Sequence, residues 1–407
     1  MRWFWFATFT LICSLLSIFF RQPLILIAEL FLIDIFLTRK VKWLFWIPKS
    51  AKRFPPWLNF SCWLLFTIWI IRVLAIDSIT IVTSAGKPQL QPGDNVIVSK
   101  IHYGPRLPQV PFISQKSYHR LAGLSGLSAI KRGDLLAFNF PEGDSVLEDM
   151  ASISYYSWKR KNESKNPNFS TPTKVRFRPL GRRSPEISRC AGLPGDTVII
   201  PSAASSSLQI SYDYLIEVRN QQLPQDFVDK LGLGATETQI LPGLGYLIPL
   251  RPDQLAFVRL RPEVNSLAAH MMEPGKGDYN IFPHDNRYPW NRDNFGPVIV
   301  PRKGDMIRLT LLNICIYKRI IEVYENNRLE ILNDQICING LPTNAYTFKQ
   351  NYYFVLGDNR HHSRDSRHWG FLPEDHIIGK PVLIWFSANK GPDQPLRIFW
   401  NRIFNRL

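Results

Sequence analysis

With 407 residues the chain is long enough to bury a substantial core, and it carries a formal net charge of +16. The basic residues form no single stripe, which argues against nucleic-acid binding and favours contact with anionic membrane lipids. The five cysteines show neither CxxC nor metal-ligand spacing, so we predict no metal and no other cofactor. Cys315 and Cys337 could pair in an oxidising compartment.

Residues 1–76 are predicted to form a membrane anchor with three transmembrane segments. The first, 3–20, is an uncharged run of 18 residues, long enough to cross a bilayer core. The second, 23–38, contains two acidic residues and is interpreted as a tilted span, with an interfacial helix as the alternative. The third, 57–76, begins with a tryptophan suited to the interface.

The loop 39–56 between the second and third segments contains six Lys or Arg residues and no acid. By the positive-inside rule this loop is cytoplasmic. The polypeptide after residue 77 is therefore predicted to lie on the outer side of the membrane.

Residues 77–407 are expected to form a mainly β domain of antiparallel sheets. Insertions are predicted near 142–172, as an exposed polar loop, and near 201–280, as a cap or subdomain. Ile79, Ile81 and Val82 are expected either to approach lipid or to build an edge strand that a bound peptide extends. The expected strands are the apolar runs NVIVSKI (95–101), DLLAFNF (134–140), KVRFR (174–178), DTVII (196–200), DMIRLTLL (305–312) and RIIEVYE (319–325).

Four motifs carry a resemblance to a known family. They are TSAGKPQLQPGDNVIVSKIHYGPRLP (83–108), KRGDLLAFNFPEGD (131–144), ISRCAGLPGDTV (187–198) and GDNRHHSRDSRHWGFLPEDHIIGKP (357–381). In order and approximate spacing they resemble the bacterial type I signal peptidases, the serine–lysine (S26) peptidases. The resemblance implies a multi-pass protein of the inner membrane whose large domain is extracytoplasmic and cleaves signal peptides from exported proteins.

The resemblance also implies a serine nucleophile and a neutral lysine as general base. The nucleophile position, nine residues before Asp94, is Ala85, and the base position, immediately before Arg189, is Ser188. Gly86 replaces the methionine that usually follows the nucleophile. Both halves of the dyad are therefore predicted to be missing. Ser84 is a possible substitute nucleophile, although in an extended segment its side chain would point away from that of Ala85.

The remaining motif residues match the frame of the family's site. Thr83 is at the position of a hydroxyl residue that completes the oxyanion hole. Ser363 is at the position of the residue that holds the lysine amine. A histidine-assisted serine using His361 or His362 is a further alternative. Two charge pairs are implied by the resemblance: Arg189 with Asp358, and Asp365 with Arg367.

Three functions remain open on the sequence. The first is an inactive homologue that binds signal peptides or partners an active signal peptidase or the export machinery. The second is a working signal peptidase with a non-standard nucleophile such as Ser84. The third is a structural membrane protein without a peptide groove.

Overall fold

The computed structural model describes residues 75–104 and 126–407, apart from several short gaps, together with six isolated positions before residue 75. The gaps are 149–152, 164–173, 202–209, 220–222, 224, 232–237 and 390–396. The predicted spans 3–20 and 23–38, the loop 39–56 and most of 57–76 therefore lie outside the described residues. Within the described part of the chain, no helix has the length and apolarity needed to cross a bilayer.

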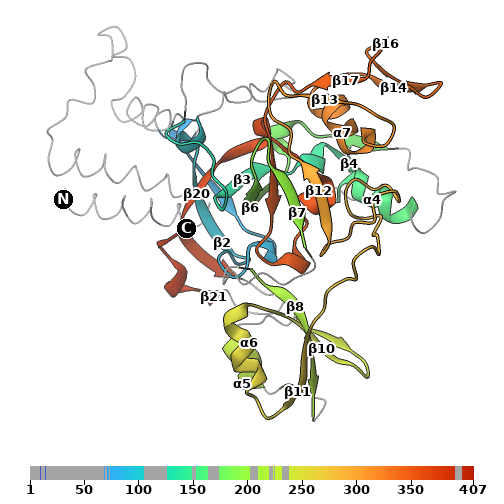
Figure 1. The fold of residues 1–407 in the computed structure, drawn as a ribbon. Helices are drawn as coiled ribbons and strands as arrows, with labels where there is room; N and C mark the ends of the chain where they lie inside the picture. Colours follow the sequence, from blue (N-terminus) through green and yellow to red (C-terminus); the bar gives the residue numbers. More distant parts are fainter. Residues whose placement is uncertain are drawn as a thin grey trace, which may run out of the picture.

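The domain is mainly β, as predicted, and is built on a nine-stranded sheet (Figure 1). The thirteen-residue strand β20 pairs with four other strands of this sheet and joins its two halves. Every ladder of the sheet is antiparallel. The main order is β1 (Ile76–Thr80), β2 (Asp94–Ser99), β20 (Ile377–Asn389), β3 (Leu135–Asn139), β6 (Pro185–Gly192), β18 (Tyr352–Leu356) and β19 (Leu372–Pro373), with β21 (Arg397–Ile398) and β22 (Asn405–Arg406) also on β20.

The two faces of the sheet bury different side chains, because side chains alternate along each strand. Ile187 of β6 joins a cluster with residues of β1, β2, β3 and β20, including the buried Ile79 and Ile81. On the opposite face of β6, Cys190 joins a second cluster with Phe138 and Trp369. Strand β6 therefore contributes to both cores, and it carries the third motif.

A second layer of short strands and helices packs beside β18 around a large aromatic and aliphatic core. Its elements are β7 (Thr197–Ile200), β12 (Phe295–Ile299), β13 (Met306–Arg308), α7 (Ile314–Arg319), β14 (Leu329–Leu332), β15 (Gln335–Ile338) and β17 (Ala345–Thr347). The other short elements, whose described residues are not part of this core, are β4 (Ser145–Leu147), α4 (Tyr155–Glu163), β5 (Val175–Phe177), β16 (Leu341–Pro342) and α8 (Ser366–Trp369).

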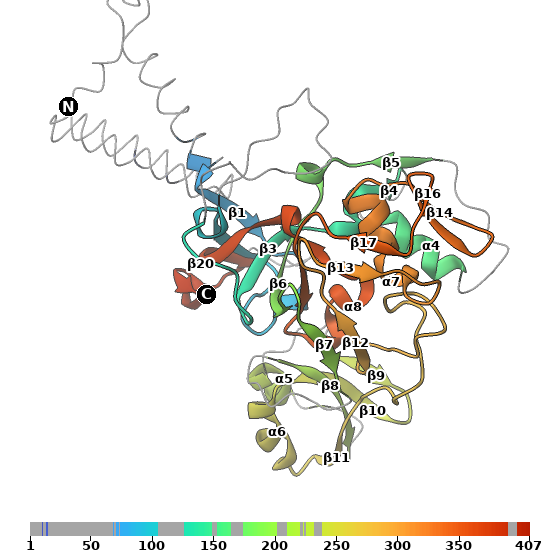
Figure 2. The same ribbon diagram turned by 45° about the horizontal axis from the view of Figure 1, so that its top comes forward.

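The predicted insertion near 201–280 contains a subdomain with its own four-stranded sheet and core. Figures 1 and 2 show it projecting from one end of the domain. Its strand order is β11-β8-β10-β9, with β11 and β9 as the two edge strands. Its elements are β8 (Tyr212–Val218), α5 (Gln225–Leu231), β9 (Gln239–Leu241), β10 (Gly245–Leu250), α6 (Pro252–Arg259) and β11 (Val264–Ala269).

Two local predictions are wrong. The segment RIIEVYE is helical, because it continues α7 into a π-helical turn, Ile320–Tyr324, that buries Ile320 and Ile321. A short apolar run does not by itself distinguish a strand from a buried helix. The described part of 142–172 is not an exposed loop, because it forms β4 and α4, and Arg160 pairs with the buried Glu142. The sequence left open whether Cys315 and Cys337 pair, and both are free thiols.

Candidate functional site

The first motif forms a tight turn whose main chain is held by the fourth motif. Ser84–Gly86 is a 3₁₀ turn that follows β1. The backbone N–H of Asn359 donates to the carbonyl oxygen of Ala85 at 3.1 Å, and its side-chain amide donates to that of Ser84 at 3.3 Å. The turn also packs against β6. The position of residue 85 is therefore fixed by two other motifs.

The third motif is joined to the first and the fourth through one guanidinium. Arg189 makes a bidentate pair with Asp358, at 2.6 and 2.8 Å, and also donates to the side-chain oxygen of Gln89 at 2.8 Å. Both members of the pair are largely buried. Bidentate arginine–carboxylate pairs are geometrically specific as well as strong. Arg189 therefore fixes how three motifs meet.

Gly357 marks the centre of this meeting point. A Cβ at Gly357 would collide with the Ser363 hydroxyl and would lie 3.0 Å from the Ala85 carbonyl oxygen. Strand β18 pairs Leu356 with Arg189, so one further step along the ladder places Gly357 opposite Ser188. Ala85, Ser188 and Ser363 therefore surround one glycine, although they are more than a hundred residues apart in sequence.

The chemistry available at this centre is limited. Residue 85 offers only a methyl group, and Ser188 offers a hydroxyl that cannot act as an amine base. Ser188 and Ser363 are each more than nine-tenths buried, and neither hydroxyl makes a hydrogen bond with any described residue. The site residues predicted from the sequence are thus brought together, but they supply neither an activated nucleophile nor a lysine base.

A second charge pair lies directly behind the centre. Asp365 and Arg367 are completely buried and are joined at 2.7 and 2.8 Å. Burial would raise the pKa of Asp365, but the Arg367 guanidinium more than offsets this and holds that pKa below its usual range. Asp365 also accepts the backbone N–H of Gly357 at 3.0 Å. The pair therefore fixes the glycine around which the three motif positions gather.

Ser84 and Thr83 differ from their expected geometry. Because residues 84–86 form a 3₁₀ turn, the expectation that Ser84 points to the face opposite Ala85 is wrong; successive side chains are about 120° apart in such a turn. Ser84 is partly buried. Thr83 is exposed and its side chain makes no capping hydrogen bond to the turn. A Cβ atom added at Gly86 would lie only 2.9 Å from the Cβ atom of Leu90.

The alternative of a histidine-assisted serine is contradicted for His361. Its side chain is fully buried between two aspartates of other elements, at 2.7 Å from Asp293 and 3.3 Å from Asp213. His362 also reaches Asp213, at 2.9 Å. Burial would raise the pKa of Asp213, but hydrogen bonds from both imidazoles hold it far below its usual range. The imidazoles therefore join the fourth motif to β8 of the inserted subdomain.

Sequence analysis missed these aspartates and also Glu186. No motif spacing marks Asp213 or Asp293, because they approach His361 only through tertiary packing. Glu186 was detectable, since it precedes Ser188 by two residues on a strand and must share its face. Burial raises the pKa of Glu186 to about 7.

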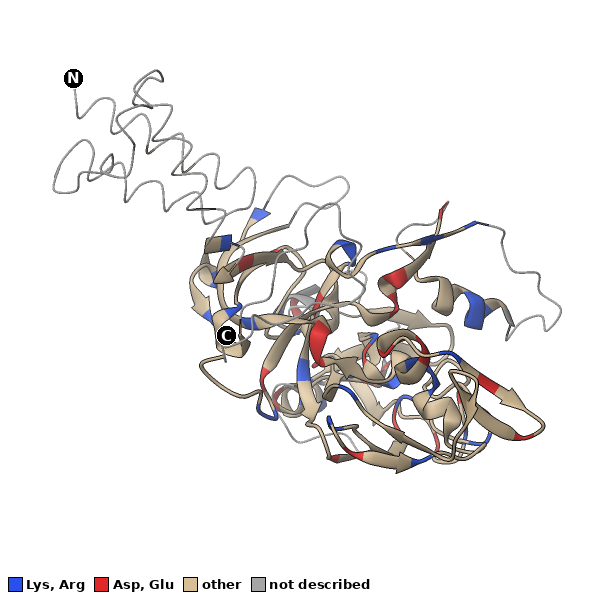
Figure 3. Cartoon of the chain, turned by 90° about the horizontal axis from the view of Figure 1, so that it is seen from above, with Lys and Arg blue, Asp and Glu red and all other residues tan. Residues whose placement is uncertain are grey.

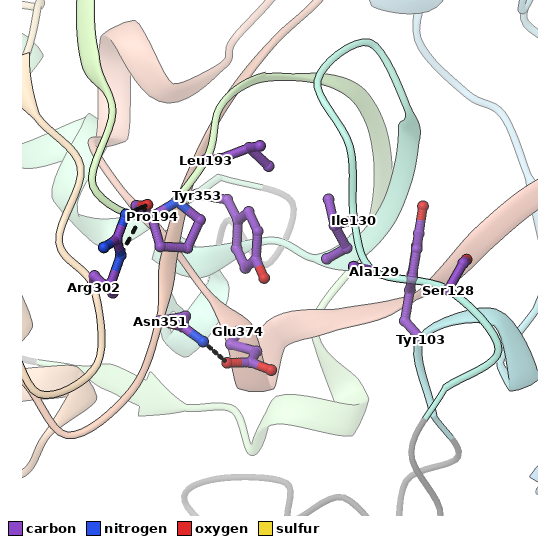
Figure 4. A pocket seen from close by; sticks show the side chains of 10 residues that line it. All are labelled: Tyr103, Ser128, Ala129, Ile130, Leu193, Pro194, Arg302, Asn351, Tyr353 and Glu374. Carbon is purple, nitrogen blue, oxygen red and sulfur yellow. Dashed lines mark hydrogen bonds between the residues drawn. The ribbon is translucent and has the colours of Figure 1, made fainter.

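A separate hollow of about 430 Å³ contains none of the predicted site residues. Figure 4 shows two hydrogen bonds within its lining: Asn351 donates to Glu374 at 2.9 Å, and Arg302 donates to the carbonyl oxygen of Pro194 at 2.9 Å. Because the hollow lacks the predicted site residues, we do not assign it to the site.

The antiparallel β domain, in which the Ser84–Gly86 turn, β6 and the loop after β18 converge on one glycine, fits the scaffold expected from the resemblance to the serine–lysine peptidases. Comparison with known sequences agrees with this. The model of the family "Signal peptidase, peptidase S26" matches residues 56–219 and 277–386, well over half of the chain. The chain therefore belongs to this family. The gap in the match, 220–276, contains most of the inserted subdomain.

Individual relatives match over shorter stretches. Signal peptidase I of Buchnera aphidicola (from Schizaphis graminum) is 36% identical over 103 residues, covering 23% of this chain and 33% of that protein. Signal peptidase I of Haemophilus influenzae is 41% identical over 69 residues, covering 17% of this chain and 20% of the relative. For signal peptidase I of Aquifex aeolicus the identity is 28% over 178 residues, covering 31% of this chain and 68% of the relative. The chain thus spans a third or less of the first two relatives.

Proposed function

We propose that this protein is a catalytically inactive member of the signal peptidase family that binds signal peptides at the membrane surface. It would be anchored in the inner membrane by several spans, with the described domain on the extracytoplasmic side. An active signal peptidase or the export machinery would be its partner. The observation that carries the proposal is the contrast at Gly357, where the surrounding charge pairs are complete while positions 85 and 188 provide neither nucleophile nor base.

The architecture near the turn supports a peptide-binding role. Strand β1 is the end strand of the main sheet among the described residues, and it leads directly into the 3₁₀ turn. Ile79 and Ile81 face the core, whereas Val82 is 82% exposed beside Thr83. An end strand with alternating inward and outward side chains is suited to adding an extended peptide as a further strand.

A second candidate function is peptide cleavage by Ser84. It is favoured by the turn geometry, which does not force the Ser84 side chain away from the centre. However, a serine hydroxyl needs a neighbouring base, and the described residues provide none hydrogen-bonded to it. We therefore rank this function second.

The test uses the full-length protein in detergent with a precursor that carries a signal peptide. We expect wild type to bind a labelled signal peptide but not to cleave the precursor. The Ala85→Ser/Ser188→Lys double variant should cleave it, because the frame of the site is already in place. Binding is measured by fluorescence anisotropy and cleavage by gel mobility.

Two further variants decide between the candidates. Ser84→Ala removes the alternative nucleophile, and Ser266→Ala changes an exposed serine of the inserted subdomain as a matched control. Cleavage by wild type that Ser84→Ala abolishes would establish the second function and overturn the first. Absence of peptide binding by both wild type and the double variant would overturn a peptide-binding role altogether.

A further inference from the structure

Three polar groups near the centre of the site have no partner among the described residues. The carboxyl group of Glu186 forms no hydrogen bond or ion pair with the described residues, and the hydroxyls of Ser188 and Ser363 form no hydrogen bond with them. Ser188 and Ser363 are 7% and 6% exposed, and Glu186 is partly buried. Their four oxygens are not among the fully enclosed polar atoms without a partner, so each remains open to a ligand or to water.

These oxygens belong to one wall of the site. Glu186 and Ser188 are two residues apart on β6, so their side chains share a face of the sheet. Their ladder partners on β3, Phe138 and Leu136, lie in the apolar cluster with Trp369. Ser363 approaches the same wall across Gly357. The floor beneath these oxygens is therefore apolar, which strengthens any charge interaction made there.

The neighbouring charges are already occupied. Arg364 lies over the ring of Phe140, with 4.9 Å from its guanidinium carbon to the ring centroid, and it is 3.9 Å from Glu142. Glu142 in turn pairs with Arg160 at 2.7 Å. Asp365 is bound by Arg367.

Among Glu142, Asp365 and Glu186, only Glu186 forms no ion pair with a described residue. Arg364 attracts its charged form at longer range, and Asp365 opposes it.

We propose that Glu186, Ser188 and Ser363 form a binding pocket for a primary ammonium group, supplied by a lysine side chain of a bound peptide. An ammonium group has three N–H donors and no acceptor, which suits three side chains whose oxygens can all accept hydrogen bonds. The proposal rests on the proposed peptide-binding function. It goes beyond that function because it states which side chain the bound peptide presents at the site.

The first test compares two signal peptides that differ at a single residue, which is lysine in one and norleucine in the other. The position of this residue is found by scanning the positions around the cleavage site for the one that faces the pocket. A charge-assisted contact of about 1.5 kcal/mol corresponds to roughly tenfold tighter binding of the lysine peptide. Glu186→Gln should reduce this ratio to about twofold or less while the norleucine peptide binds as before. Glu330→Gln changes a partly exposed glutamate of β14; it is the matched control and should leave the ratio unchanged.

The second test needs no peptide and separates this proposal from the previous one. We expect n-butylammonium chloride to raise the melting temperature of the full-length protein more than sodium chloride or n-butanol does. This difference in melting temperature should disappear in Glu186→Gln and become smaller in Ser188→Ala. If wild type binds no signal peptide but retains the ammonium effect, the proposed function fails and the pocket stands. Equal binding of lysine and norleucine peptides, or an ammonium effect that survives in Glu186→Gln, would overturn the pocket.

Discussion

The frame of the site and its centre differ in how completely their polar groups are paired. In the frame, Arg189 and Arg367 each make a bidentate pair with an aspartate and also donate to a main-chain carbonyl group. At the centre, the hydroxyls of Ser188 and Ser363 and the carboxyl of Glu186 have no partner among the described residues. Both regions are built from the same strands and loops, so the difference does not come from the fold.

This difference distinguishes residues that are retained for the stability of the fold from residues that are retained for activity. Removing one member of a buried charge pair leaves the other charge without compensation, so such pairs are maintained by stability whatever the protein does. Residues 85 and 188 carry no such constraint, because a methyl group or a hydroxyl fits the same space without an ion. An intact frame is therefore evidence for the architecture of the site, whereas activity depends on the centre.

The largest effect is expected from breaking the completely buried pair of the frame. Arg367→Ala leaves Asp365 buried and uncompensated and should lower the free energy of unfolding by about 3–5 kcal/mol. Chemical denaturation followed by tryptophan fluorescence measures this loss. Arg328→Ala is the matched control, because Arg328 pairs with Glu330 at 2.6 Å but is 77% exposed, and it should cost about 0.5 kcal/mol or less. Equal losses in both variants would contradict the distinction between buried and exposed pairs.

A somewhat smaller effect is expected from the guanidinium that joins three motifs. Arg189→Ala should cost about 2–3 kcal/mol, because Asp358 loses its partner but some solvent can reach the space. The variant should also weaken binding of a signal peptide, since the Ser84–Gly86 turn loses its connection through Gln89. Arg132→Ala, which breaks an exposed pair with Asp196, tests whether any lost arginine has this effect. Unchanged peptide binding in Arg189→Ala would show that the turn is fixed by Asn359 alone.

The sequence was informative about these pairs because they lie within motifs of fixed spacing. The mainly β class followed from short apolar runs bounded by Gly and Pro, and β2, β3 and β7 lie where those runs predict. The approach of Asp213 and Asp293 to His361 could not be predicted, because it depends on where the inserted subdomain docks. Ile320 and Ile321 were misassigned to a strand because β-branched residues in a short run favour a strand, whereas here they fill a core from a helical turn.

The docking of the inserted subdomain gives a third prediction. Asp213→Asn removes the carboxylate that both imidazoles approach and should cost about 1–2 kcal/mol at pH 7. The folded-state pKa of Asp213 is depressed, so its contribution to stability is present above the unfolded value of about 4 and is lost as the pH falls below it. The acid limb of wild-type stability between about pH 4 and pH 2 should therefore be steeper than that of the variant. Hydrogen exchange should show the loss first in β8. Asp253→Asn, at an exposed pair, is the control.

The smallest effect is a gain in stability at the centre of the site. The pKa of Glu186 is raised by burial to about 7, so between its unfolded value of about 4.5 and pH 7 the folded state holds the proton more tightly than the unfolded state does. Ionisation of Glu186 therefore destabilises the fold increasingly as the pH rises through this window. Glu186→Gln should be nearly neutral at pH 4.5 and stabilising by about 1–2 kcal/mol at pH 8, after allowance for partial solvent exposure. Urea denaturation of both proteins at the two pH values measures the difference, with Glu330→Gln as control. A gain that does not depend on pH would mean that Glu186 is not the uncompensated acid of the site.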